Sequence, residues 1–155
     1  MFQGHSICSL DAKSRLVLPL KFRKYIKTEA NNKLILTRGM DECILVYPQD
    51  EWDKIKSVLL NYNVFNAEQR YFMREFLFFV NECDIDSQNR ILLPSQLTEF
   101  AHVKKEVLVL GMLDKIEIWD PETKKHYDEK RYGTYEDIAQ KVSETILNKK
   151  FDIQI

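Results

Sequence analysis

The sequence contains few of the residues that build disulfide frameworks or metal sites. Its 155 residues include three cysteines, Cys8, Cys43 and Cys83, and three histidines, all widely separated and without a Cys-x-x-Cys pair. Structural disulfides and zinc sites need closely spaced ligands, and a catalytic thiol needs a base held against it. We therefore expect three partly buried thiols, no metal, no cofactor and no thiol catalysis.

Glycine, proline and long apolar runs are also scarce. Four glycines and four prolines exclude collagen-like and linker-like chains. The longest apolar runs, 76–80 and 107–110, are far shorter than the roughly 20 residues of a membrane-spanning helix. The first residues show no basic segment followed by an apolar stretch, as a secretory signal would. We expect a folded intracellular protein, with no membrane partner and a single core.

A net excess of positive or negative charge is nearly absent overall, because the net charge is only -1. The distribution is uneven, however: residues 1–48 have eight Lys and Arg against four Asp and Glu, and residues 49–120 are acidic. A local basic surface can bind phosphate, since screening limits each contact to about 8 Å. A solvated surface would have the same composition, so charge alone leaves both interpretations open. The cations concentrated in residues 11–27 are Lys13, Arg15, Lys21, Arg23, Lys24 and Lys27.

The sequence contains an internal repeat. Residues 11–19 align with residues 86–94 as Asp-x-x-x-Arg, three apolar residues and Pro, at an offset of 75. Residues 39–47 resemble residues 111–119 at an offset of 72. Two matched blocks in the same order, differing by a loop-sized length, indicate a duplication.

Alternation of polar and apolar residues predicts strands in each copy, with a short helix after the proline. Units of about 40 residues rarely bury enough surface alone, so the two copies are expected to pack as a pseudo-dimer within the chain. The expected strands are 6–10, 16–18, 34–37, 44–47, 107–110 and 116–119.

Two helices are predicted between the copies. The first begins at Pro48, and the second begins at Asn66 as N-cap with Gln69 three residues later. The second helix is apolar around most of its circumference, so it is buried either in the monomer or between subunits. We favour a subunit contact, and its candidate residues are Phe72, Phe76 and Phe79.

The C-terminal segment 121–155 mixes charges evenly up to Gly133. A capping pattern at Thr134 then predicts a helix. The narrow apolar stripe of this helix, Ile138, Val142 and Ile146, could dock on the same chain or on a neighbouring one.

The repeated Asp-x-x-x-Arg pattern does not indicate enzyme chemistry. Asp11 and Asp86 each precede an arginine by four residues, which favours a fixed ion pair or a capped loop over a proton donor. The sequence has no Gly-rich phosphate loop and no hydrolase motif. We therefore expect neither catalytic residues nor a small-molecule substrate.

The same loop has residues suited to binding nucleic acid. Lys13 and Arg15 are two residues apart, so on an extended backbone they project to the same side. Arginine can contact phosphate or guanine through two hydrogen bonds, and lysine contacts phosphate as a point charge. In the second copy Gln88 replaces the lysine and Arg90 is retained. The alternative is that both arginines are only structural partners of their aspartates.

The combination of motifs resembles the MraZ family of bacterial transcriptional regulators over about residues 1–120. The matching segments are Met1-Phe2-x-Gly4, Leu10-Asp11-x-Lys13-x-Arg15-Leu16-x-x-Pro19, Tyr47-Pro48 with Trp52, Arg90-Ile91-Leu92-Leu93-Pro94 and Ile116-Glu117-Ile118-Trp119. The resemblance implies an α+β, mainly β fold with two swapped-hairpin domains of the AbrB type arranged as an intrachain pseudo-dimer. The expected domains are 1–48 and 84–120, with a helical connection at 49–83 and a helical tail at 121–155.

The resemblance also implies a function. It predicts a closed homo-oligomeric ring in the bacterial cytoplasm, associated with the nucleoid and bound to short tandem repeats in double-stranded promoter DNA upstream of the cell-division and cell-wall gene cluster. The family's DNA contacts fall on Lys13, Arg15 and Arg90. Lys21 and Arg23, from the same basic stretch, are further candidates.

One departure from the family pattern lies in the loops. Ser14 and Asn89 stand where the family usually has glycine, and Asp11 and Asp86 are the loop-forming carboxylates. If this position needs a positive φ, asparagine accepts it readily and serine does so at a cost of about 1 kcal/mol. A competing interpretation is a ring-forming scaffold protein that has lost DNA binding, supported by this serine and by the acidic second copy.

Overall fold

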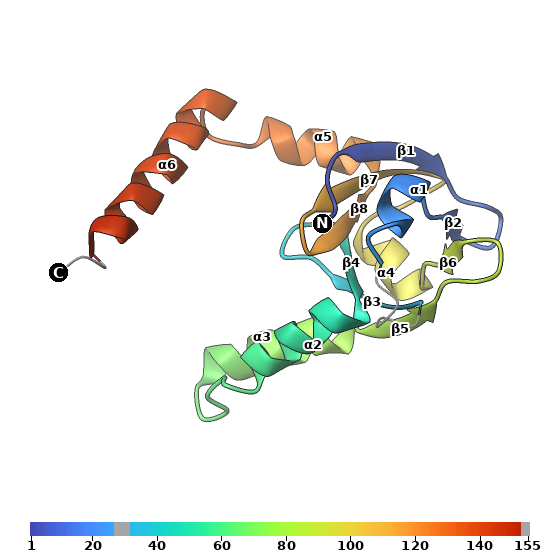
Figure 1. The fold of residues 1–155 in the computed structure, drawn as a ribbon, viewed down its shortest axis with the longest axis horizontal. Helices are drawn as coiled ribbons and strands as arrows, with labels where there is room; N and C mark the ends of the chain where they lie inside the picture. The colour runs from blue at the N-terminus through green and yellow to red at the C-terminus, as the bar shows by residue number, and fades with distance from the viewer. Residues whose placement is uncertain (27–31, 153–155) are drawn as a thin grey trace. The chain divides into compact units, whose positions relative to one another are not determined.

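The computed structural model describes residues 1–26 and 32–152, with side chains up to Lys149 (Figure 1). Lys27, one of the cations of the basic stretch, lies outside the described residues. The chain divides into two compact units, Met1–Thr123 and Lys124–Ile155. Both copies of the repeat fall within the first unit.

The first unit contains two sets of elements that follow one another in the same order. The first repeat contains β1 (His5–Ser9), β2 (Arg15–Val17), α1 (Leu20–Arg23), β3 (Lys33–Arg38) and β4 (Ile44–Pro48). The helices α2 (Gln49–Leu59) and α3 (Ala67–Phe78) follow. The second repeat contains β5 (Asn81–Asp84), β6 (Arg90–Leu92), α4 (Ser95–Phe100), β7 (Glu106–Met112) and β8 (Lys115–Trp119). Strand β5 therefore crosses the expected domain boundary between residues 83 and 84.

The main sheet has six antiparallel strands in the order β1-β7-β8-β4-β3-β5. Exchanging each strand for its equivalent in the other repeat gives the same order read from the opposite edge, so the sheet has an internal twofold symmetry. Strand β1 pairs with β7 of the second repeat, and β5 pairs with β3 of the first. Each repeat thus donates an edge strand to the other. This exchange confirms the α+β fold of two swapped hairpins in one chain.

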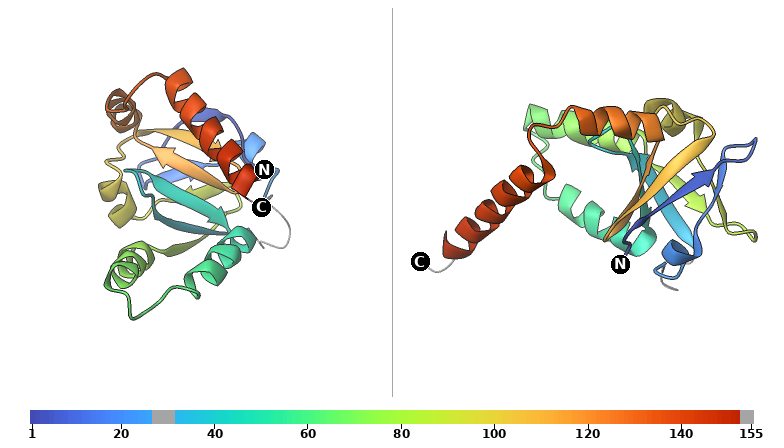
Figure 2. Two further views of the ribbon diagram at one scale, coloured as in Figure 1. Left: turned by 90° about the vertical axis from the view of Figure 1, so that its left-hand side faces the viewer. Right: turned by 90° about the horizontal axis from the view of Figure 1, so that it is seen from above.

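The symmetry axis passes through two strand pairs. In the central pair Leu45 lies opposite Glu117, its equivalent at the offset of 72. In a separate two-stranded sheet, β2 and β6, Leu16 lies opposite Ile91, its equivalent at the offset of 75. Figures 1 and 2 show these short strands and their loops at the end of the first unit remote from α2 and α3.

Two apolar clusters form the core. The larger one joins both repeats, with equivalent side chains such as Leu16 and Ile91, or Phe22 and Leu97, at most 1% exposed. The second lies between the sheet and the two helices, where Trp52 stacks on Phe76 at 5.8 Å. Trp52 and Leu59 are buried and form the inner face of α2.

The N-terminal residues extend the sheet along β7. Phe2 and Leu113 exchange two backbone hydrogen bonds of 2.8 Å, and the Phe2 side chain is buried. A Cβ atom at Gly111 would overlap the backbone of Phe2 and Gln3, so glycine is required there. The Met1-Phe2-x-Gly4 segment is therefore part of the fold and not a loose end.

Helix caps explain where the helices begin. The Asn66 side chain accepts a hydrogen bond of 3.0 Å from the Gln69 N–H, which confirms the predicted start of α3. A further helix, α5 (Pro121–Glu129), lies within the expected helical tail, although its evenly mixed charges gave no separate pattern for it. Its signal is Asp120 followed by proline: the Asp120 carboxylate accepts hydrogen bonds from the N–H and hydroxyl of Thr123.

The second unit consists of the rest of α5 and α6 (Tyr135–Asp152). Thr134 and Asp137 form reciprocal hydrogen bonds at the start of α6, which confirms the predicted capping pattern. Val142 and Ile146 of the apolar stripe are more than half exposed. Within the described ranges, no helix is both long enough and apolar enough to cross a membrane.

Candidate nucleic-acid interface

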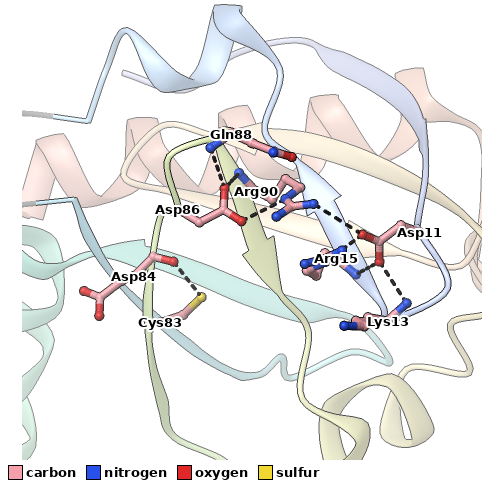
Figure 3. A network of polar contacts seen from close by, with 8 residues as sticks. All are labelled: Asp11, Lys13, Arg15, Cys83, Asp84, Asp86, Gln88 and Arg90. Carbon is pink, nitrogen blue, oxygen red and sulfur yellow. Dashed lines mark hydrogen bonds and ion pairs between the residues drawn. The ribbon is translucent and has the colours of Figure 1, made fainter.

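The first candidate loop, Asp11–Arg15, is closed by the Asp11 carboxylate (Figure 3). Oδ1 accepts hydrogen bonds from the N–H groups of Lys13 and Arg15, both at 2.9 Å. Oδ2 accepts one from the Arg15 Nε at 2.6 Å. One short side chain thus fixes the backbone of the loop and the direction of its arginine.

The second loop, Asp86–Arg90, repeats this geometry. The Asp86 Oδ1 accepts hydrogen bonds from the N–H groups of Gln88 and Arg90, both at 2.9 Å. Its Oδ2 accepts one from the Arg90 Nε at 2.8 Å. Every contact of the first loop has an equivalent of nearly the same length, so the duplicated sequence produces duplicated local structure.

The two loops are joined across the symmetry axis. The N–H of Leu93 donates to the Ser14 carbonyl at 3.0 Å, and the N–H of Leu18 donates to the Asn89 carbonyl at 2.9 Å. The Arg90 Nη1 also lies 3.9 Å from the Asp11 Oδ2 of the other loop. The loops therefore form one structural unit together with the β2–β6 sheet that connects them.

Ser14 and Asn89 occupy the left-handed region, with φ angles of 59° and 61°. The positive φ on which the expected cost of serine depends is thus present in both loops. Asparagine tolerates this conformation and serine is strained in it. Serine nevertheless closes the first loop in the same way as asparagine closes the second. The backbone of the first loop is therefore not distorted relative to the second.

Replacing Ser14 with glycine is expected to stabilise the protein by up to about 1 kcal/mol, because glycine adopts a positive φ without steric strain. The same change at Asn89 is expected to have a smaller effect. Urea-induced unfolding of the two variants and the wild type measures both. A Ser14→Gly variant less stable than the wild type would show that the serine is not strained.

The charge state of the loops follows from their hydrogen bonds. The backbone N–H of Arg15 and its guanidinium hold the pKa of Asp11 below its ordinary value of 3.8, and Arg90 does the same for Asp86. Both carboxylates are therefore ionised at neutral pH and do not act as proton donors. Their bonds to Nε engage one of the five N–H donors of each guanidinium.

The predicted DNA-contact residues differ in the exposure of their side chains and in their hydrogen-bond partners. Lys13 is exposed, whereas the side chains of Arg15 and Arg90 are 30% and 22% exposed. The Lys21 ammonium donates to the carbonyl of His5, and the Arg23 Nε donates to the Leu18 carbonyl at 2.9 Å. Lys21 and Arg23 therefore bind the backbone of β1 and the end of β2, a role that the sequence did not indicate.

The predicted oligomer-contact residues pack within the chain. Phe76 is only 6% exposed and stacks on Phe72 as well as Trp52. Phe79 follows the last residue of α3 and contacts Phe100. The exposed aromatic side chains of this helix are instead Tyr71 and Phe78, seven residues apart, which are not among the predicted contact residues. Their spacing marks a second stripe along the helix.

The described residues contain no cluster of three or more His, Cys, Asp or Glu side chains placed to bind a metal ion. Burial raises the pKa of each cysteine thiol, Cys8, Cys43 and Cys83, above its ordinary value. A raised pKa makes a thiol a weaker nucleophile at neutral pH. These cysteines thus behave as packing residues.

Two swapped-hairpin repeats, joined in one chain and presenting paired loops with lysine and arginine, define the class of AbrB-like pseudo-dimers. Comparison with known proteins then identifies the family: the family model described as "MraZ protein, putative antitoxin-like" matches residues 1–75 and 79–151. The chain belongs to the MraZ family.

Several relatives are similar to the chain over most of its length, and each is named "Transcriptional regulator MraZ". The protein of Halothermothrix orenii is 36% identical over all of both chains. That of Carboxydothermus hydrogenoformans is 37% identical over 95% of this chain and 100% of its own. That of Syntrophobacter fumaroxidans is 43% identical over 79% of this chain and 81% of its own. These names describe regulators and not enzymes.

Proposed function

We propose that the protein is a sequence-specific DNA-binding transcriptional regulator. It binds short tandem repeats upstream of the cell-division and cell-wall gene cluster, as a homo-oligomeric ring associated with the nucleoid in the bacterial cytoplasm. The observation that supports this most strongly is the pair of joined loops, which brings Lys13, Arg15 and Arg90 from distant parts of the sequence to one end of the first unit (Figures 1 and 3).

A ring accounts for how a nearly neutral chain binds DNA. Each subunit offers only a few cationic contacts, which alone would give weak, salt-sensitive binding. Several subunits on regularly spaced repeats raise the effective concentration of every further contact. The weak overall charge then favours spaced repeats over random DNA, since single contacts are too weak to hold.

The ring contact is proposed on the outer face of α3. Phe76 is buried in its own subunit, whereas Tyr71 and Phe78 are 66% and 71% exposed. Tyr71 and Phe72 line a cavity of about 170 Å³, together with Arg38, Met40 and Glu75. Exposed aromatic side chains next to a hollow are typical of protein–protein contacts.

Replacing Phe78 with aspartate is therefore expected to convert the oligomer to smaller species, because an unpaired carboxylate is costly in an apolar contact. Size-exclusion chromatography with light scattering measures the mass. Leu20→Asp, at a side chain that is 68% exposed on α1, is the matched control and should leave the mass unchanged. A Phe78→Asp protein with the wild-type mass would exclude this face as the contact.

The function is tested by fluorescence anisotropy with two labelled duplexes, one containing the gene's own upstream region and one a scrambled version, at two salt concentrations. We expect tight binding to the upstream duplex that survives nonspecific competitor. Equal binding to both duplexes would contradict the proposal and favour the scaffold interpretation.

A further inference from the structure

Gln88 occupies the position in the second loop that Lys13 occupies in the first. The two residues are equivalent at the offset of 75, and the N–H of each donates to the Oδ1 of its loop aspartate at 2.9 Å. Both side chains are exposed. Because the backbone and not the side chain makes this bond, the loop closes in the same way with lysine or with glutamine.

The symmetry axis relates the two positions. Arg15 lies opposite Leu92, and Val17 lies opposite Arg90, so the two loops lie at opposite ends of the short sheet and are related by the symmetry axis. The contact between Arg90 and Asp11 joins them directly (Figure 3). A DNA duplex that meets Lys13 therefore meets Gln88 at the symmetry-related position.

The chemistry at these two positions differs although the backbone does not. A lysine ammonium only donates hydrogen bonds and is attracted to phosphate or to the acceptors of guanine. A glutamine amide has no charge, but it donates and accepts, and so matches the N6 and N7 atoms of adenine with two hydrogen bonds. One half of the interface therefore favours a strong acceptor and the other an adenine edge.

Resting on the proposed function, we infer that Gln88 is a specificity-determining residue that reads an A·T pair in each repeat. The difference between Lys13 and Gln88 also gives each binding site a direction. A symmetric dimer reads a palindrome, because its two halves present the same side chains to the DNA. This pseudo-dimer presents different ones, which suits repeats that all point the same way.

The test is selection of bound duplexes from a library in which one repeat is randomised, with the full-length oligomer. The wild type is compared with Gln88→Ala, Gln88→Lys and Ser87→Lys. The last variant adds the same charge at the neighbouring exposed position, whose equivalent is Ala12 and not Lys13. It separates added charge from base reading.

We expect Gln88→Ala to lose about tenfold preference for A·T at one base pair of the repeat, while its salt dependence stays that of the wild type. Gln88→Lys should bind inverted and direct repeats with affinities within about threefold, because its two loops then present the same lysine and arginine. Ser87→Lys should raise affinity for all duplexes alike.

Two results would overturn the inference, and they differ in what they imply for the proposed function. A Gln88→Ala protein that selects the same bases as a selective wild type would show that Gln88 reads nothing, while the proposed function stands. A wild type that selects no sequence at all would remove the proposed function, and this inference with it.

Discussion

Arg15→Ala is expected to lower the affinity for tandem-repeat DNA by at least about 100-fold. Each subunit loses a contact worth about 1–3 kcal/mol, and the losses multiply across a ring whose subunits bind together. The Asp11 carboxylate also loses the Nε bond of 2.6 Å that orients the loop. Fluorescence anisotropy over a salt series gives both the affinity and the slope of its logarithm against that of salt.

Lys54→Ala is the matched control for this change. It removes one positive charge from α2, where the Lys54 side chain is 68% exposed and pairs with Glu51, remote from the loops. Its affinity should stay within about twofold of the wild type if contacts and not net charge decide binding. A salt slope for Arg15→Ala equal to that of the wild type would mean that Arg15 touches no phosphate.

Leu16→Ala is expected to destabilise the protein by about 2–5 kcal/mol, the range for a fully buried leucine. The Leu16 side chain is 0% exposed and lies opposite Ile91 where the symmetry axis crosses the short sheet. The cavity would open between the two repeats, whose core is shared and does not simply repack. Urea-induced unfolding followed by circular dichroism measures the loss.

Val17→Ala, one residue further along the same strand, is the control because its side chain is 53% exposed. It should change the free energy of unfolding by less than about 1 kcal/mol. Equal destabilisation by the two variants would show that β2 does not bury one face in the shared core.

The repeat and most strands could be predicted from the sequence, because both rest on local patterns. Asp11 and Asp86 each precede an arginine by four residues, and Asp-x-x-x-Arg closes a loop by contacts within five residues. The exchange of β1 and β5 between repeats could not be derived in this way. A strand alternates polar and apolar residues whether it pairs with its own hairpin or with the other one, so only the resemblance to a family indicated the exchange.

Side-chain contacts that depend on the folded backbone were also beyond prediction. Lys21 and Arg23 resemble free cations in a list of charges, yet both bind backbone carbonyls that the fold brings to them. The stacking of Phe76 on Trp52 follows from the packing of α3 on α2, which helical periodicity alone does not determine. The bounds of helix α5 within the expected helical tail could not be predicted, because its cap, Asp120, precedes a segment with no apolar face.

We expect both loops of one subunit to meet DNA together. A photo-activated benzophenone amino acid, placed in separate variants at Ala12, Ser87 and Val58, tests it without relying on affinity. The first two are exposed loop positions, and Val58 is a 56% exposed position on α2. We expect both loop variants to cross-link to the upstream duplex and Val58 to give background only. Loop variants that give no more adduct than Val58 would contradict the account.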